Sequence, residues 1–395
     1  MTTYNSPTIE RENPAYAFNQ QLVDAFHDTD RVRDPIHNLY RYPARFSPRF
    51  VSHIIENLSS PGDLILDPFL GGGTTAVEAR LSGRRFLGGD ISELACFVAR
   101  TRSTPLTESD CDSIDSSISS FSMKGRPKQN FSEYYFRNLM SPDTHHLAQV
   151  VSKLMAWSEG LEAERLRGAA RVIVLRAAQI AIDGRLRFPT ETEFLVLFQR
   201  VGKENVKALR DYSRRTKQVD KDSPIGRGRF RSRIINDTAE NLGRRSQSGL
   251  VKLMITSPPY PGIHVLYHRW QLKGGKETPL PFLIAGKKDG HGLAHYTMNA
   301  RSRSNNGASY FNQIKESYRG VRNLLHEDAT VVQLVAFSKP RVQLEQYLEV
   351  MDEAGYRQAD LSSNLVRLVP NRRWHAMAKG TTSSSREFLL THKVK

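Results

Sequence analysis

Between an apolar run and a segment that favours helix, the chain reads Asp67-Pro68-Phe69-Leu70-Gly71-Gly72-Gly73-Thr74-Thr75. The preceding residues, 64–66, have the composition of a buried strand, and residues 76–79 favour helix. Glycines between a strand and a helix let the backbone turn tightly and come close to a ligand. The stretch therefore predicts a ligand-binding loop in an α/β fold.

A second stretch gives the loop a more specific meaning. After another strand-like run, 250–255, the chain reads Thr256-Ser257-Pro258-Pro259-Tyr260. Together the two stretches resemble the S-adenosylmethionine-dependent amino-methyltransferases of DNA, whose cofactor loop reads DPF-x-GxGTT and whose catalytic loop reads (S/D/N)PPY. The alternative is a pair of glycine- and proline-rich turns in some other α/β enzyme.

The resemblance covers residues 36–100 and 230–395 and implies a class I, Rossmann-like methyltransferase fold with a mostly parallel seven-stranded sheet. Residues 36–106 and 230–395 would form the catalytic domain. Residues 1–35 are interpreted as an N-terminal arm with one short helix around 19–26. The remainder, 107–229, is interpreted as a helical insertion and a candidate target-recognition subdomain.

Hydrophobic periodicity places the elements along the chain. Strands are expected at 84–91, 230–236, 250–255 and 330–337, with a closing pair at 364–369 and 387–391. Helices are expected at 50–58, 144–158, 163–183, 190–216, 310–325 and 342–354. The Ser- and Asp-rich segment 107–130 is expected to be a loop.

The cofactor prediction centres on the glycine loop and on Asp90, which lies 17 residues after Gly73. An acidic residue at about this distance is placed to accept hydrogen bonds from ribose hydroxyls. The same geometry suits NAD, and Asp90 could instead cap the helix that follows it. In the related enzymes a segment before the loop closes over the methionine end, and a polar residue after the third strand contacts the adenine end. S-adenosylmethionine is therefore expected to contact Tyr42, Pro43, Ala44, Arg45, Phe46, Asp67, Pro68, Phe69, Gly71, Gly73, Thr74, Thr75, Asp90, Ile91 and Asp237.

The catalytic residues implied by the resemblance are Ser257, Pro258, Pro259 and Tyr260. An exocyclic amino group is poorly nucleophilic, and acceptors such as the Ser257 Oγ and the Pro258 carbonyl would stabilise its developing positive charge. The prolines would stiffen the loop, and Tyr260 would stack on an extruded base. The plainer alternatives are a turn residue for Ser257 and a core aromatic for Tyr260.

A serine at the first motif position is typical of cytosine-N4 enzymes, whereas adenine-N6 enzymes commonly carry Asp or Asn there. Adenine-N6 methylation and methylation of RNA remain alternatives, as does an inactive DNA-binding module. A ring-carbon methyltransferase would need a nucleophilic cysteine after a proline, but Cys96 follows alanine and Cys111 follows aspartate.

The formal charge of +16 favours a polyanionic partner, most commonly nucleic acid. Residues 201–233 carry eleven Lys and Arg against four Asp and Glu, and 261–305 carry seven against two. We expect the second segment to be a loop that orders over DNA. The candidate nucleic-acid-binding residues are Arg227, Arg229, Arg231, Lys273, Lys276, Arg301 and Arg303. A charged run can also be simply a solvated face.

The histidine pairs His264/His268 and His291/His295 lack acidic partners, so no metal site is expected. With only two cysteines the chain has no disulfide framework. It shows neither a long apolar run nor a signal-peptide pattern, which predicts a soluble, cytoplasmic protein. DNA is the expected partner, and a cognate restriction endonuclease is a second candidate.

Overall fold

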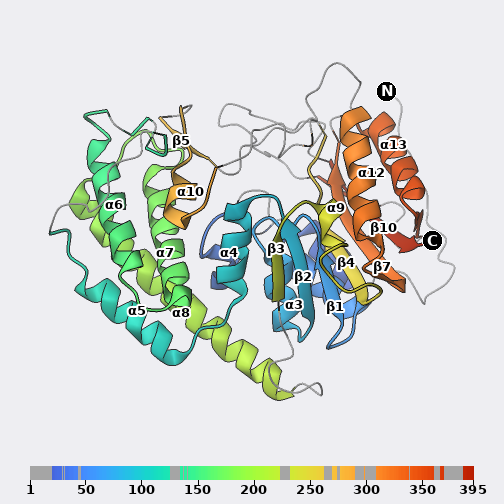
Figure 1. Cartoon of the computed structure of the whole chain (residues 1–395), viewed down its shortest axis with the longest axis horizontal. Coiled ribbons are helices and arrows are strands. Elements are labelled where there is room, and N and C mark those ends of the chain that lie inside the picture. Colours follow the sequence, from blue (N-terminus) through green and yellow to red (C-terminus); the bar gives the residue numbers. More distant parts are fainter. Residues whose placement is uncertain are drawn as a thin grey trace.

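The computed structural model shows a sheet lobe beside a helical lobe (Figure 1). It describes residues 20–28, 30, 32–42, 46–124, 134–136, 138–139, 141–222, 232–261, 269–273, 276–289, 298, 308–337, 339–359, 365–368 and 386–395.

The sheet has the strand order β3-β2-β1-β4-β7-β10-β8. Its first five members pair in parallel, whereas β10 runs antiparallel to its neighbours. This order, with one antiparallel strand inserted beside the fifth, is the class I methyltransferase topology, and it confirms the predicted fold class. The bounds are β1 Leu64–Asp67, β2 Arg85–Asp90, β3 Ser232–Asn236, β4 Val251–Thr256, β7 Leu325–Ala336, β8 Tyr356–Gln358 and β10 Arg386–Val394.

The sheet has one strand more than expected. The expected closing pair exists as β9, Val366–Leu368, paired antiparallel with β10. The position beyond β10 is taken instead by β8, whose three residues are too few to give a periodic pattern. The sheet therefore contains eight strands, with β9 off the main path.

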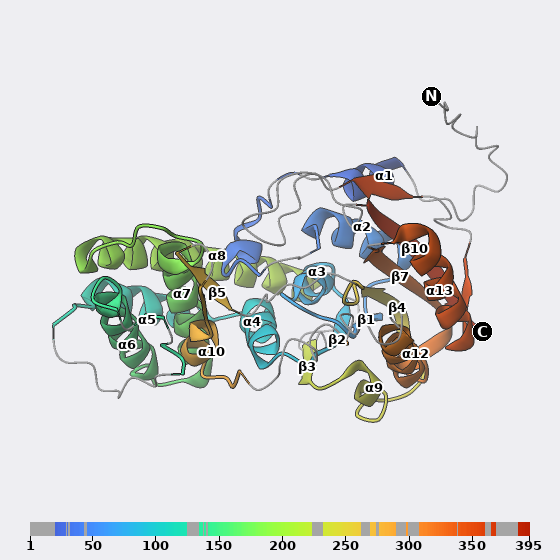
Figure 2. The ribbon, with the colours of Figure 1, turned by 90° about the horizontal axis from the view of Figure 1, so that it is seen from above.

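Helices cover both faces of the sheet, as the view from above shows (Figure 2). Parallel strands buried on both faces need apolar residues at successive positions, and β1 and β4 supply them. One face packs with α1 to α4, and the other with α9, α12 and α13. Their bounds are α1 Gln20–His27, α2 Pro48–Leu58, α3 Thr74–Leu81, α4 Glu93–Ser103, α9 Ala239–Leu242, α12 Ala308–Arg322 and α13 Pro340–Glu353.

The helical lobe is built around a third hydrophobic cluster, which also takes in Val77 of α3 and Leu94 and Phe97 of α4. It contains α5 Glu108–Ser120, α6 His145–Glu159, α7 Glu164–Ile182 and α8 Glu191–Asp222. The short hairpin β5 Trp270–Leu272 and β6 Lys276–Thr278, with α10 Leu280–Ala285, packs into the same cluster. The expected loop 261–305 is thus partly regular structure, and the chain returns to the helical lobe after the second motif.

The prediction of a loop at 107–130 is wrong for its first half. Thr107 and Asp110 form a reciprocal capping box that starts α5. Cys111, Ile114 and Ile118 then fall on one buried face of the helix. Because the serines and aspartates between them are exposed or half-buried, the composition obscured the helical spacing.

Helix α8 joins the two lobes. Its 32 residues correspond to a length of about 48 Å, since each helical residue adds about 1.5 Å. In Figure 2 the helix runs from the helical lobe to the neighbourhood of α3. There Asp220 receives two hydrogen bonds of 2.8 Å from Arg80, a largely buried side chain of α3. The far end of the insertion is therefore fixed to the helix of the glycine loop.

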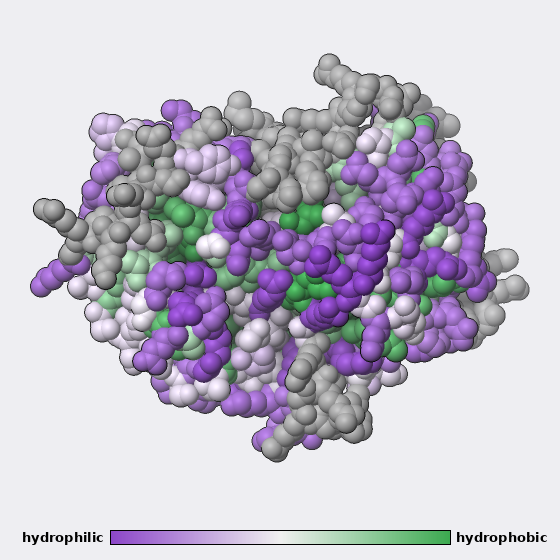
Figure 3. All heavy atoms as spheres, in the orientation of Figure 1, coloured by the Kyte–Doolittle hydropathy of each residue, from purple (hydrophilic) through white to green (hydrophobic). Residues whose placement is uncertain are grey.

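Hydrophilic residues cover much of the face in Figure 3, with hydrophobic residues exposed in small areas between them. Within the described residues, no helix combines the length and apolar character needed to cross a bilayer.

The buried residue His392 on β10 gives a test of the core. Among the described residues, neither of its ring nitrogens finds a hydrogen-bond partner. Burial lowers the pKa of His392 to about 4. The unfolded chain therefore binds this proton more readily, and the stability that depends on neutral His392 is lost as pH falls from the ordinary pKa toward 4. The full effect corresponds to about 3 kcal/mol.

We expect His392→Phe to remove this part of the pH dependence, because phenylalanine does not titrate. Urea unfolding at pH 7.5 and 5.0 would measure the loss of stability in each protein. The same change at the exposed His27 serves as the control. Equal pH dependence in wild type and His392→Phe would contradict the expectation.

Candidate active site

The glycine loop turns from β1 into α3 with two left-handed residues, Gly71 at φ +50° and Gly73 at φ +79°. A side chain at Gly73 would also place its Cβ 2.6 Å from that of Ala99. At Gly72 a Cβ would lie 2.8 Å from the Tyr42 Cβ. The loop therefore needs glycine both for its backbone conformation and for the close approach of α4 and Tyr42.

The Asp67 carboxylate, at the end of β1, connects this loop to the second motif. It accepts hydrogen bonds from Thr75 Oγ1 at 2.8 Å, from Thr256 Oγ1 at 2.9 Å and from the Phe69 amide at 3.2 Å. Asp67 is 1% exposed, and burial raises its pKa to about 7. The two sequence motifs thus meet at one buried group.

Asp90 lies at the end of β2, beside the same loop. Its Oδ2 accepts the Gly71 amide at 2.8 Å and its Oδ1 accepts the Ser92 amide at 2.8 Å. Burial raises the pKa of Asp90 to about 6. The helix that follows is capped by the Ser92 side chain, so Asp90 itself is not the cap. Each carboxylate oxygen can accept a further hydrogen bond from a ligand.

The segment before the glycine loop is held by groups that the sequence did not reveal. The buried Arg102 donates to the Gly72 carbonyl at 2.6 Å and to the Tyr40 carbonyl at 2.7 Å. The Gln179 amide on α7 bonds both the backbone N–H and the carbonyl of Arg41. The helical lobe therefore helps to place Tyr42, whose ring lies against the glycine loop.

The second motif begins at the end of β4. Ser257 Oγ donates to the Tyr260 hydroxyl at 2.9 Å, which in turn donates to Glu387 Oε1 at 3.2 Å. Tyr310 of α12 donates to the Pro259 carbonyl at 2.7 Å. These contacts fix the motif from two sides, by α12 and by β10.

Other candidate cofactor residues have structural contacts of their own. Phe69 lies against Tyr318, with ring centroids 6.3 Å apart, and Phe46 lies at the same distance from Phe50. Asp237 accepts the Thr238 amide and the Asn241 side chain, and it pairs with Arg245 at 2.8 Å. No contact of this structure assigns these three side chains to a ligand.

Pro68 is buried beneath the loop, and Ile91 is half-buried beside Asp90. The Ile91 carbonyl accepts a hydrogen bond from Asn236, at the end of β3. Pro43, Ala44 and Arg45 lie outside the described residues.

Of the candidate nucleic-acid residues, the structure describes only Lys273, directly after β5, and Lys276, the first residue of β6, so that both lie at the end of the hairpin where its strands connect. Lys273 pairs with Asp143 on the helical lobe, and Lys276 is exposed. The others, Arg227, Arg229, Arg231, Arg301 and Arg303, lie outside the described residues, as do the histidine pairs at 264/268 and 291/295.

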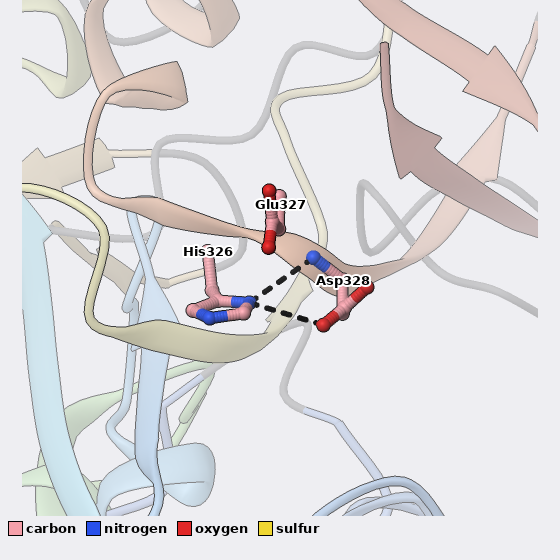
Figure 4. A group of neighbouring side chains, drawn as sticks. All are labelled: His326, Glu327 and Asp328. Atoms are coloured by element: carbon pink, nitrogen blue, oxygen red, sulfur yellow. Dashed lines mark hydrogen bonds and ion pairs between the residues drawn. The ribbon is translucent and has the colours of Figure 1, made fainter.

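One group of potential metal ligands occurs among the described residues, at His326, Glu327 and Asp328 (Figure 4). These residues are consecutive at the start of β7, where His326 Nδ1 accepts the Asp328 amide at 3.1 Å. Because β7 runs parallel to β4, this end of the strand lies at the opposite sheet edge from Ser257. The group is therefore separate from the candidate active site.

The carboxyl ends of β1, β2, β3 and β4 bring Asp67, Asp90, Asn236 and Ser257 to one edge of the sheet. In open α/β sheets this edge is where ligands bind. The Thr74 hydroxyl, at the start of α3, is buried and without a hydrogen-bond partner among the described residues. An unsatisfied hydroxyl beside a close-approach glycine loop fits a polar ligand such as S-adenosylmethionine.

The comparisons with known proteins agree with this site. A family model described as DNA methylase matches residues 9–100, which include the glycine loop and Asp90. The chain is 32% identical over 79 residues to the type II methyltransferase M.MjaII of Methanocaldococcus jannaschii, covering 20% of this chain and 15% of that protein. It is 37% identical over 83 residues to the DNA adenine methyltransferase YhdJ of Escherichia coli, covering 21% and 28%.

The similarity to these curated relatives is therefore local and spans less than a third of their length. Among solved structures, a geranyl diphosphate methyltransferase in complex with S-adenosylmethionine is similar at 10% identity and a TM-score of 0.33, over 94% of each chain. The family match and the class I topology together identify S-adenosylmethionine as the cofactor.

We expect Asp90→Asn to weaken S-adenosylmethionine binding by about 2 kcal/mol, because it removes the charge that strengthens hydrogen bonds from ribose hydroxyls. Wild-type affinity should also fall as pH is lowered through about 6, where Asp90 becomes protonated. The Asp90→Asn protein should not show this fall.

Calorimetric titration with S-adenosylmethionine at pH 7.5 and 5.5 would measure both effects. Asp63→Asn, in the turn before β1, is the matched control. Unchanged affinity in Asp90→Asn would remove the ribose assignment.

Proposed function

We propose that this chain is a DNA methyltransferase that transfers a methyl group from S-adenosylmethionine to the exocyclic N4 amino group of cytosine. The proposal rests above all on one observation, the hydrogen bonds by which Asp67 joins the glycine loop to the Ser257–Tyr260 motif. This arrangement puts an acceptor-bearing, proline-stiffened loop next to the cofactor loop. The sulfur of the cofactor, its methyl group and the amino nitrogen that receives the methyl group can then be held in one line.

When bound, the cofactor would supply a methyl group on a positively charged sulfur, which keeps the electron pair of the broken sulfur–methyl bond. The methylated amino nitrogen then releases one proton to water. The protein contributes alignment and electrostatic stabilisation. We assign the ribose to Asp90, the methionine end to the segment containing Tyr42, and the adenine end to the region of Asp237. The Ser257 Oγ would accept a hydrogen bond from the target amino group and stabilise its developing charge.

A base that reacts inside the site must leave the duplex. Tyr260 is suited to stack on an extruded base, because its hydroxyl is held by Ser257 and Glu387. A ring that is already fixed loses less conformational freedom when the base arrives.

The helical lobe is the proposed target-recognition element. β5, which belongs to this lobe, begins ten residues after Tyr260, and β6 and α10 follow it. The lobe is therefore connected to the motif by a short stretch of chain. The net charge of +16 supports a polyanionic partner. Because M.MjaII is named a type II methyltransferase, a cognate restriction endonuclease is a reasonable partner to seek.

Adenine N6 is the second candidate target. YhdJ is named a DNA adenine methyltransferase, and the DNA methylase family model carries both N6 and N4 in its name. The serine at position 257 favours cytosine, because the cytosine-N4 enzymes that the motif resembles commonly carry serine there, whereas adenine-N6 enzymes commonly carry Asp or Asn.

Ser257→Ala should reduce methyl transfer by about 100- to 1,000-fold while leaving S-adenosylmethionine affinity unchanged, because the acceptor acts mainly in the transition state. Mass spectrometry of nucleosides from methylated DNA would identify the product of the wild-type protein. N4-methylcytosine is expected. N6-methyladenine as the sole product would refute the cytosine assignment and leave the amino-methyltransferase proposal intact. Transfer of labelled methyl to RNA instead of DNA would indicate an RNA methyltransferase.

The logarithm of the affinity for duplex DNA should fall linearly with the logarithm of the salt concentration, with a slope near −0.9 for each phosphate neutralised. Removing three phosphate contacts should therefore make this slope less negative by about 2.7. We expect this flattening when Arg227, Arg229 and Arg231 are changed together to Gln. Fluorescence anisotropy over a salt series measures the slope. Neutralising three exposed arginines of the sheet lobe, Arg319, Arg341 and Arg357, is the control. An unchanged slope in the first variant would place the contacts elsewhere.

A further inference from the structure

The motif tyrosine and serine belong to a chain of hydrogen bonds that ends on a buried ion pair. Glu387 lies at the start of β10 and is 1% exposed. Its Oε1 accepts from the Tyr260 hydroxyl at 3.2 Å. Its Oε2 faces Arg367 of β9, whose Nε lies at 2.7 Å and Nη2 at 2.6 Å.

Arg367 is itself fixed in place. Its Nη1 donates to the Phe26 carbonyl of α1 at 2.7 Å, and its guanidinium lies 5.1 Å from the Phe26 ring centroid. A guanidinium only donates hydrogen bonds. With two of its N–H groups directed at Oε2, it favours an ionised carboxylate that only accepts.

The direction of every hydrogen bond in the chain follows from this ion pair. Because the carboxylate can only accept, the Tyr260 hydroxyl must donate its single proton to Glu387. Its oxygen must then accept from Ser257, which commits the only Ser257 proton. What Ser257 Oγ can still offer to a ligand is its lone pairs.

We propose that Glu387 is a positioning residue for methyl transfer, which acts through Tyr260 to make Ser257 Oγ an obligate acceptor for the target amino group. This inference rests on the proposed function. The target amino group donates hydrogen bonds and therefore requires acceptors. A serine hydroxyl that rotates freely would in some orientations direct its own O–H at the amino group, where it cannot act as an acceptor. The network Arg367–Glu387–Tyr260–Ser257, here called the hydroxyl relay, removes that wrong orientation before the base arrives. The relay orients the hydroxyls and transfers no proton.

Glu387→Gln tests the direction of the relay with little change in shape. Arg367 presents two N–H groups, so the new amide must turn its oxygen toward Arg367 and its NH₂ toward Tyr260. The Tyr260 hydroxyl would then accept from that NH₂ and donate to Ser257. The Ser257 proton would be left pointing at the target amino group.

We expect Glu387→Gln to lower kcat by about 10- to 100-fold, with the KM values for S-adenosylmethionine and DNA within about twofold of wild type. Tyr260→Phe keeps the aromatic ring but breaks the relay, so it should lower kcat as well. In the double variant, Glu387→Gln should cause no further fall in kcat, because its effect on Ser257 passes through the Tyr260 hydroxyl. Glu353→Gln, which removes a carboxylate from the Lys315 ion pair between α12 and α13, is the control and should leave kcat unchanged.

The measurements are single-turnover and steady-state transfer of labelled methyl to DNA, together with urea unfolding of the four proteins of the cycle. If wild type methylates DNA and the fold-loss of kcat in the double variant equals the product of the two single losses, the relay is refuted and the proposed function stands. If wild type transfers no methyl to DNA, the proposed function fails and the unfolding cycle decides the relay. Non-additive unfolding free energies support the Tyr260–Glu387 hydrogen bond, and additive ones overturn it.

Discussion

The active-site edge depends on one buried carboxylate, Asp67. A carboxylate removed from water needs several donors, and here Thr75, Thr256 and the Phe69 amide supply them. These donors come from positions that are far apart in the sequence, so the desolvation cost of one group is offset only when both motif loops are in place. The cofactor loop and the motif loop therefore stabilise each other through Asp67. A strand pairing that displaced either loop would leave the buried Asp67 carboxyl group with fewer donors.

The sheet was predictable from the sequence because buried parallel strands require continuous apolar runs. β1 and β4 contain such runs, and a proline follows each strand by one or two residues. The two motifs were found for the same reason, since each is a short contiguous stretch at a strand end. The catalytic role of Ser257 remains a prediction, although the structure brings it to the same sheet edge as Asp90.

What the sequence did not reveal depends on contacts between distant residues. Glu387 is 127 positions from Tyr260, and Gln179 is 138 positions from Arg41. No local pattern distinguishes these residues from surface polar groups. Arg102 has the appearance of an ordinary helical arginine, yet it is 1% exposed and bridges two backbone carbonyls. Helix α5 was missed for a different reason, because its polar residues far outnumber the three apolar residues on its buried face.

The helical lobe is assembled from two separate parts of the chain, the α5–α8 region and the β5–α10 region that follows the motif loop. A protein engineer could not transfer this lobe to another enzyme as a single cassette. A graft limited to 107–229 would leave behind Trp270, Leu272 and Phe282, and would expose the apolar surface of α7 that they cover. A chimera that carries this lobe intact would therefore require the exchange of two separate segments, the second of them beginning just downstream of the Ser257–Tyr260 motif.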